Sequence, residues 1–283
     1  MSLYRLDDPP AMVAPRLVAA FDGWVDAGAA ATRAASRLSD GGTVVASFNA
    51  DVLFDYRARR PTLDIVDGRL TQLTWPELVL RHARLDGRDV LVLTGAEPDF
   101  RWQEFADAIG ELVDRLGVTE WISLGAIPAA VPHTRAVPIL GTASAPDLLK
   151  GDIQAGPVGL LRVPSAALSV LELQLSRAGM PAVGYFAQVP HYVSGPYPAA
   201  TLALLRALER HLDVAIPIGS IEDEASRMRA SLDAAAAADE STRAYVERLE
   251  SMVDEARLPS GGELISEIER FLRDRGGEGS ERT

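Results

Sequence analysis

Short apolar runs alternate with amphipathic stretches along most of this chain. The apolar runs at 17–21, 43–48, 89–94, 121–125, 139–143 and 182–189 have the length of strands, and the stretches ending near 38 and at 101–116, 165–178 and 198–212 have helical spacing. This alternation is typical of βαβ units, in which helices connect neighbouring strands of an open sheet. We therefore expect an α/β fold with a mostly parallel or mixed sheet.

Two segments within this pattern predict hairpins instead of βαβ units. Segment 62–74 alternates around Asp67-Gly68, and segment 77–93 alternates around Asp86-Gly87. Asp-Gly between alternating residues is a strong turn signal, because both positions of such a turn favour positive φ.

The composition of the sequence changes at Gly219, after which acidic residues are enriched. The segment 219–283 contains 16 acidic and 9 basic residues, a net charge of −7 out of the total of −12. Ser220 begins a capping box before an apolar stripe, and a polar break follows at 239–242. One helix over 220–256 would be on the order of 55 Å long, so we expect a break near 240 or a projecting arm. We expect an α/β domain at 1–218, a helical appendage at 219–275 with a further helix after Ser260, and a disordered tail at 276–283.

Composition excludes several classes of function. The chain has a net charge of −12, and Lys150 is its single lysine, which argues against a nucleic-acid partner. It contains no cysteine, so thiolate catalysis, disulfides and Cys-ligated metals are excluded. No segment is apolar enough for a signal peptide or a membrane span, so we expect a cytoplasmic protein without membrane contact.

The familiar cofactor and catalytic motifs are missing. The glycine-containing turn 22–28 lacks the lysine and hydroxyl residue of a phosphate-binding loop, and it does not match a dinucleotide fingerprint. Neither a Gly-x-Ser-x-Gly elbow nor a His-Glu-x-x-His helix occurs. We expect no cofactor and no dedicated metal site.

Polar side chains nevertheless follow four of the predicted strands. Ligands of open parallel sheets bind beyond the carboxyl ends of the strands, so these loops predict a pocket for a small polar ligand. The candidates are Asp22, Trp24, Asp26, Gly95, Glu97, His133, Arg135, His191 and Tyr192. Each also has a structural interpretation: Asp26 and Asp99 are placed to cap helices, and both histidines follow a proline in a rigid loop.

A second group lies in segment 51–61. It contains Phe54, Tyr56, Arg57 and Arg60 beside two aspartates. Arginine and aromatic residues are favoured at protein interfaces, so these four residues are candidates for an interface. The alternative is a surface turn with internal ion pairs.

The same segments resemble the PAC2 (proteasome assembly chaperone 2) family. The resemblance covers roughly residues 15–212 through the segments 21–28, 54–57, 95–99, 132–135 and 190–193, with Arg60-Pro61. It implies a three-layer α/β/α core of the phosphorylase/hydrolase-like type and association with itself or with a protein partner. Relatives in eukaryotes and archaea dock on the proteasome core particle through a C-terminal hydrophobic–tyrosine–any-residue motif. The sequence ends Gly-Ser-Glu-Arg-Thr283, so we expect that this docking mode does not carry over.

Two hypotheses about function remain open. The first is a non-catalytic interaction or assembly factor that forms a homo-oligomer and has a protein partner, which the resemblance relates to the proteasome. The second is a small-molecule hydrolase or phosphorylase-like enzyme, or a ligand sensor, that uses the pocket at the strand ends. In the enzyme, Asp26 or Glu97 would be the acid or metal ligand, His133 or His191 the base, and Arg135 the anion clamp.

Overall fold

The computed structural model describes residues 3–151, 153–156 and 159–256. The chain divides into two compact units, Met1–Asp233 and Ala234–Thr283. The helix expected after Ser260 and the tail expected at 276–283 lie outside the described residues.

Within the described residues, nine strands of the first unit form one mixed sheet in the order β1-β3-β6-β7-β2-β8-β11-β9-β10. They are β1 (Tyr4–Leu6), β2 (Arg16–Asp22), β3 (Thr43–Phe48), β6 (Leu78–Leu85), β7 (Arg88–Ala96), β8 (Glu120–Ala129), β9 (Ile139–Ala143), β10 (Gln154–Ala155) and β11 (Ala182–Pro190). The central strands β7, β2, β8 and β11 are parallel, whereas β6, β3 and β1 add an antiparallel flank. The hairpin predicted at 77–93 explains this change of direction, because its second strand is β7 and its first strand is β6.

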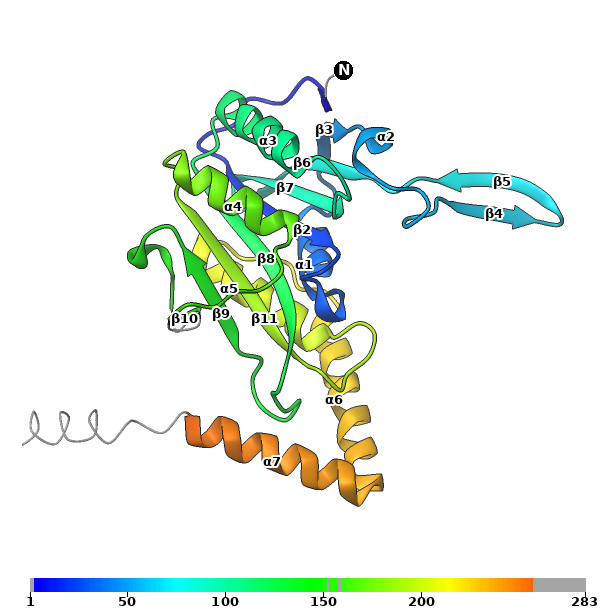
Figure 1. The fold of residues 1–283 in the computed structure, drawn as a ribbon, viewed down its shortest axis with the longest axis vertical. Coiled ribbons are helices and arrows are strands. Elements are labelled where there is room, and N and C mark those ends of the chain that lie inside the picture. The colour runs from blue at the N-terminus through cyan, green and yellow to red at the C-terminus, as the bar shows by residue number, and fades with distance from the viewer. Residues whose placement is uncertain (1–2, 152, 157–158, 257–283) are drawn as a thin grey trace, which may run out of the picture. The chain divides into compact units, whose positions relative to one another are not determined.

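Helices cover both faces of this sheet (Figure 1). The helical segments are a 3₁₀ turn (Ala27–Ala29), α1 (Ala30–Leu38), α2 (Ala50–Leu53), α3 (Trp102–Leu116), a second 3₁₀ turn (Pro146–Leu148), α4 (Ala167–Arg177), α5 (Pro198–Leu212), α6 (Ile221–Ala238) and α7 (Glu240–Ala256). Along β2, Leu17 and Phe21 pack in a core with α3 and α4, whereas Val18 and Ala20 pack in a core with α1 and α5. Successive side chains of a strand point to opposite faces, so one buried strand supplies both cores. The expected three-layer α/β/α arrangement is confirmed.

The other predicted hairpin projects from the sheet as a two-stranded arm, formed by β4 (Thr62–Val66) and β5 (Arg69–Thr74) (Figure 1). Every residue of both strands is exposed. Leu63 pairs with Leu73 and Ile65 pairs with Leu70, with a register shift between the two pairs. Cross-strand partners share a face, and so do residues two apart in a strand, so all four apolar side chains lie on one face of the arm. Leu70 and Leu73 are three residues apart in β5, a spacing that would place them on opposite faces of a regular strand. The bulge adds one residue between them and so returns both side chains to the same face.

The helices after Gly219 follow the expected break. Helix α6 ends at Ala238 and α7 begins at Glu240. The carboxylate of Asp239 accepts a 2.7 Å hydrogen bond from the backbone N–H of Thr242 and bonds from two hydroxyls, and these bonds lower the pKa of Asp239 to about 2. None of the helices in the described ranges combines the length and apolar character of a bilayer-spanning helix.

Candidate functional site

The loops at the carboxyl ends of the parallel strands are linked in pairs by side-chain hydrogen bonds. One group lies around Glu97 and links the loops after β2 and β7. The other lies around His133 and links the loops after β8 and β11.

Glu97 is a buried carboxylate with two backbone partners. Its Oε1 accepts a 2.7 Å hydrogen bond from the N–H of Ala167, and its Oε2 accepts a 3.3 Å bond from the N–H of Trp24. A Cβ atom at Gly23 would lie 2.4 Å from Oε2 and 2.8 Å from Cβ of Glu97, so a larger residue there would displace this side chain. Glu97 therefore holds three segments of the chain together: the loop after β2, the end of β7 and the start of α4.

Two aspartates of the same loops lie on either side of an arginine that the sequence did not single out. Nε of Arg59 lies 3.7 Å from Asp99, and Nη1 lies 3.7 Å from the carboxylate of Asp22. Arg59 also donates a 3.1 Å hydrogen bond to the carbonyl of Asp22. Asp99 accepts a 2.8 Å bond from the N–H of Asp55, and the residue at the N-cap position of α3 is Arg101, so Asp99 is not the expected cap of that helix. Trp24 is 65% exposed beside this group.

Asp26 caps the helix that follows it, as the structural interpretation expected. Oδ1 accepts hydrogen bonds from the N–H groups of Ala31, at 2.8 Å, and Thr32, at 3.3 Å, across the intervening 3₁₀ turn. Oδ2 accepts a third bond from the Thr32 hydroxyl. Burial raises the pKa of Asp26, and the three hydrogen bonds offset only part of that rise.

His133 is almost fully buried and is bound through both ring nitrogens. The Tyr192 hydroxyl oxygen lies 2.7 Å from the backbone N–H of His133, which donates to it, and 2.7 Å from Nδ1. Nε2 faces a carboxylate oxygen of Asp233, which accepts its proton, so a neutral imidazole carries its proton on Nε2 and Nδ1 accepts from the Tyr192 hydroxyl. Nε2 lies 3.2 Å from Asp233 of α6, which also pairs with Arg229. Burial raises the pKa of Asp233, but the bonds from Arg229 and His133 outweigh it and lower that pKa overall.

Two further pocket candidates lie in the loops that carry this group. His191 is exposed, and its Nδ1 lies 3.0 Å from the carbonyl of Ala129. Its ring meets the Tyr192 ring edge to face, with centroids 5.7 Å apart. Arg135 is half-buried in the loop after β8.

The interface candidates lie at the base of the arm. Phe54 is buried in the core, whereas Arg57 and Arg60 are exposed. The Tyr56 ring packs against Trp75, with centroids 4.8 Å apart, and its hydroxyl donates a 2.6 Å bond to Asp51. Burial and this carboxylate raise the pKa of Tyr56 to about 12.

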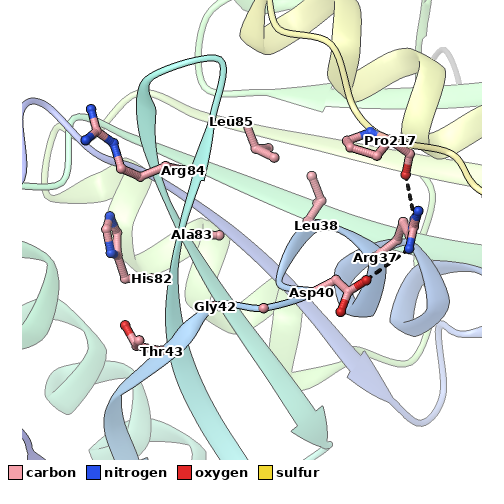
Figure 2. A pocket seen from close by; sticks show the side chains of 11 residues that line it. Arg37, Leu38, Asp40, Gly42, Thr43, His82, Ala83, Arg84, Leu85 and Pro217 are labelled. Carbon is pink, nitrogen blue, oxygen red and sulfur yellow. Dashed lines mark hydrogen bonds and ion pairs between the residues drawn. The ribbon is translucent and has the colours of Figure 1, made fainter.

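A groove of about 650 Å³ lies between the base of the arm and α1. We call it the arginine groove, because Arg59, Arg60 and Arg81 line it, and Asp22 and Gly95 of the predicted pocket line it as well. A second pocket, of about 410 Å³, lies where α1 ends beside β3 and β6 (Figure 2). There Arg37 bonds to the carbonyl of Pro217 and to Asp40, and none of the predicted site residues lines the pocket.

Among the described residues, no group of three or more carboxylate or imidazole side chains is arranged to hold a metal ion. The strand ends therefore provide carboxylates bonded to backbone N–H groups, two hydrogen-bonded histidines and an open groove that contains arginines.

The chain is similar to several solved structures of bacterial and archaeal proteins. It shares 35% identity with a Corynebacterium glutamicum protein of unknown function, with a TM-score of 0.84, covering 89% of this chain and 97% of that one. It shares 36% identity with a Mycobacterium tuberculosis proteasome-assembly chaperone homologue, with a TM-score of 0.74, covering 81% and 99%. A Pyrococcus furiosus proteasome activator, at 15% identity and a TM-score of 0.64, covering 82% and 97%, shares the fold.

Comparison with curated proteins gives no significant match. The match to a family is extensive: the model of the PAC2 family matches residues 20–236, which contain most of both cores, the arm and most of α6. The chain belongs to the PAC2 family.

Proposed function

We propose that the chain is a non-catalytic, self-associating assembly factor, and that the apolar face of the arm is its contact surface. The observation that carries this proposal is the exposure of Leu63, Ile65, Leu70 and Leu73 on one face of a hairpin that has no core beneath it.

Physical reasons favour a partner for this surface. An isolated two-stranded hairpin is marginally stable in water, and contiguous exposed apolar patches mark interaction sites. Leu70 is 71% exposed and Ile65 is 62% exposed, although both are large apolar residues on a projecting element. We assign a second copy of this chain as the partner, because a symmetric contact lets the same apolar face cover itself.

The residues at the base of the arm support the proposal. Tyr56 and Trp75 pack together there, and Arg57 and Arg60 are exposed beside them. Tyrosine, tryptophan and arginine dominate the binding energy of many interfaces. The Mycobacterium tuberculosis relative is described as a proteasome-assembly chaperone homologue, and we extend an assembly role, with a proteasome-related partner, to this chain by that similarity.

The carboxylates predicted for catalysis also favour an interaction role. Backbone N–H groups bond to both oxygens of Glu97 and to Oδ1 of Asp26, and the Thr32 hydroxyl bonds to Oδ2 of Asp26, so both oxygens of each carboxylate are occupied. A general acid or metal ligand needs an oxygen directed at the substrate or the metal.

The test is light scattering coupled to gel filtration over a range of protein concentrations. We expect a defined oligomer for the full chain and dissociation for the double variant Ile65→Ser, Leu70→Ser. The matched control is Thr62→Ser with Gln72→Ser in the same strands. A monomeric wild type, or an oligomer that both double variants leave intact, would refute the proposal.

A further inference from the structure

Arg81 is a half-buried cation without a partner in the described part of the chain. It lies on β6 opposite Val92, which belongs to the core with α1 and α5, so its side chain is on the α1 side of the sheet. Across the described ranges it makes neither a hydrogen bond nor an ion pair. Charged side chains are seldom buried without a partner, because the lost hydration is not compensated.

Other groups in the arginine groove have unused hydrogen-bonding capacity. Thr94 and Ser36 line the groove near Arg81, and the side chain of neither makes a hydrogen bond to another described residue. Arg60 has no ion pair among the described residues either. By contrast, the carboxylates of Asp22 and Asp99 and the carbonyl of Asp22 hold Arg59 in place.

The charge in the groove differs from that of the whole chain. Three arginines line it together with two acidic residues, Asp22 and Glu77, and Asp22 pairs with Arg59. The chain as a whole has a net charge of −12, whereas arginines outnumber acidic residues in the lining of this groove. An anion that enters the groove therefore meets two unpaired guanidinium groups and donor hydroxyls.

We propose that the arginine groove binds a small organic oxyanion, either a carboxylate or a phosphate ester. A guanidinium group donates two parallel N–H bonds to either of these groups. The groove volume of about 650 Å³ falls in the range of small-molecule sites. Trp75, which is 48% exposed at the same groove, offers an apolar surface for a carbon skeleton. This proposal does not rest on the self-association proposed above, although the groove shares Arg60 and Trp75 with the base of the arm.

The test is isothermal titration of the full-length protein with succinate and with inorganic phosphate, against sodium chloride at equal ionic strength. We expect saturable binding of at least one probe, and the preferred probe identifies the ligand as a carboxylate or a phosphate. Arg81→Gln is expected to weaken binding by about tenfold or more, because hydrogen bonds to a charged group are lost. Arg69→Gln, at the exposed tip of the arm, makes the same change in net charge and is expected to bind as the wild type does.

A second measurement separates a ligand-binding arginine from a structural one. Without a ligand, Arg81→Gln is expected to unfold at the same temperature as the wild type or a higher one, because an unpaired charge has been removed. The preferred probe is then expected to raise the melting temperature of the wild type more than that of Arg81→Gln or Arg81→Lys. A response that sodium chloride reproduces, equal binding by Arg81→Gln and the wild type, or a loss of ligand-free stability in Arg81→Gln would overturn the proposal.

Discussion

The backbone N–H of Ala167 donates a 2.7 Å hydrogen bond to Oε1 of Glu97. Ala167 is the first residue of α4, and Glu97 directly follows β7, so this bond joins the start of a helix to the end of a strand. A carboxylate at the N-terminus of a helix also interacts favourably with the helix dipole. The second oxygen of Glu97 accepts from Trp24, so one buried side chain fixes the end of β7 to two other segments.

We expect Glu97→Gln to destabilise the protein by about 1–3 kcal/mol, because the new amide group places a donor against one of the two backbone N–H donors. Urea unfolding of the full chain measures the change in the free energy of unfolding. The matched control is Glu111→Gln on the exposed surface of α3, which is expected to have little effect. Equal stability of the two variants would mean that the backbone bonds to Glu97 add nothing to the fold.

Most elements of the sheet could be predicted from the sequence, because turns and regular alternation depend on residues that are close together in the chain. The Asp-Gly turns fixed both hairpins, and Asp67 and Asp86 adopt the positive φ that such turns need. The short strand β1 and the helix α2 were not predicted. Strand β1 depends on pairing with β3, and α2 has only four residues, so neither has a period long enough to recognise.

The candidate site was harder to predict than the fold. The rule for parallel strands selected four loops that side-chain hydrogen bonds link in pairs, but it could not identify the partner of each side chain. Arg59 lies far from Asp99 in the sequence, and Asp233 lies still farther from His133, so only the folded chain brings these pairs together. The apolar face of the arm also depends on a bulge between Asp64 and Ile65, which alternation alone does not reveal.

Asp26 predicts a pH dependence of stability. Burial raises its pKa, so the folded state binds a proton more readily than the unfolded state, whose aspartate titrates near 4. Above that pH, stability falls as the pH rises through the raised pKa. We therefore expect the wild type to gain stability relative to Asp26→Asn as the pH is lowered toward about 4, measured by urea unfolding at several pH values.

Asp26→Ala is expected to lower the free energy of unfolding by about 0.5–2 kcal/mol at neutral pH, because the cap of α1 is lost. A stability difference between the wild type and Asp26→Asn that does not vary with pH would contradict this assignment.

The Tyr192 hydroxyl provides a prediction for the histidine group. It accepts from the backbone N–H of His133, and because Asp233 accepts from Nε2 of that ring, we assign the hydroxyl as the donor to Nδ1. Tyr192→Phe removes one oxygen and leaves two polar atoms of a buried residue without that partner, so we expect a loss of about 1–3 kcal/mol in the free energy of unfolding. Tyr56→Phe removes the same atom at a site where the hydroxyl has a single carboxylate partner, so a smaller loss is expected there. Urea unfolding of both variants makes the comparison, and the ¹⁵N chemical shifts of the His133 ring test the tautomer. A proton on Nδ1 in the neutral wild type would contradict the hydrogen-bond assignment, since Tyr192 could then not donate to that atom.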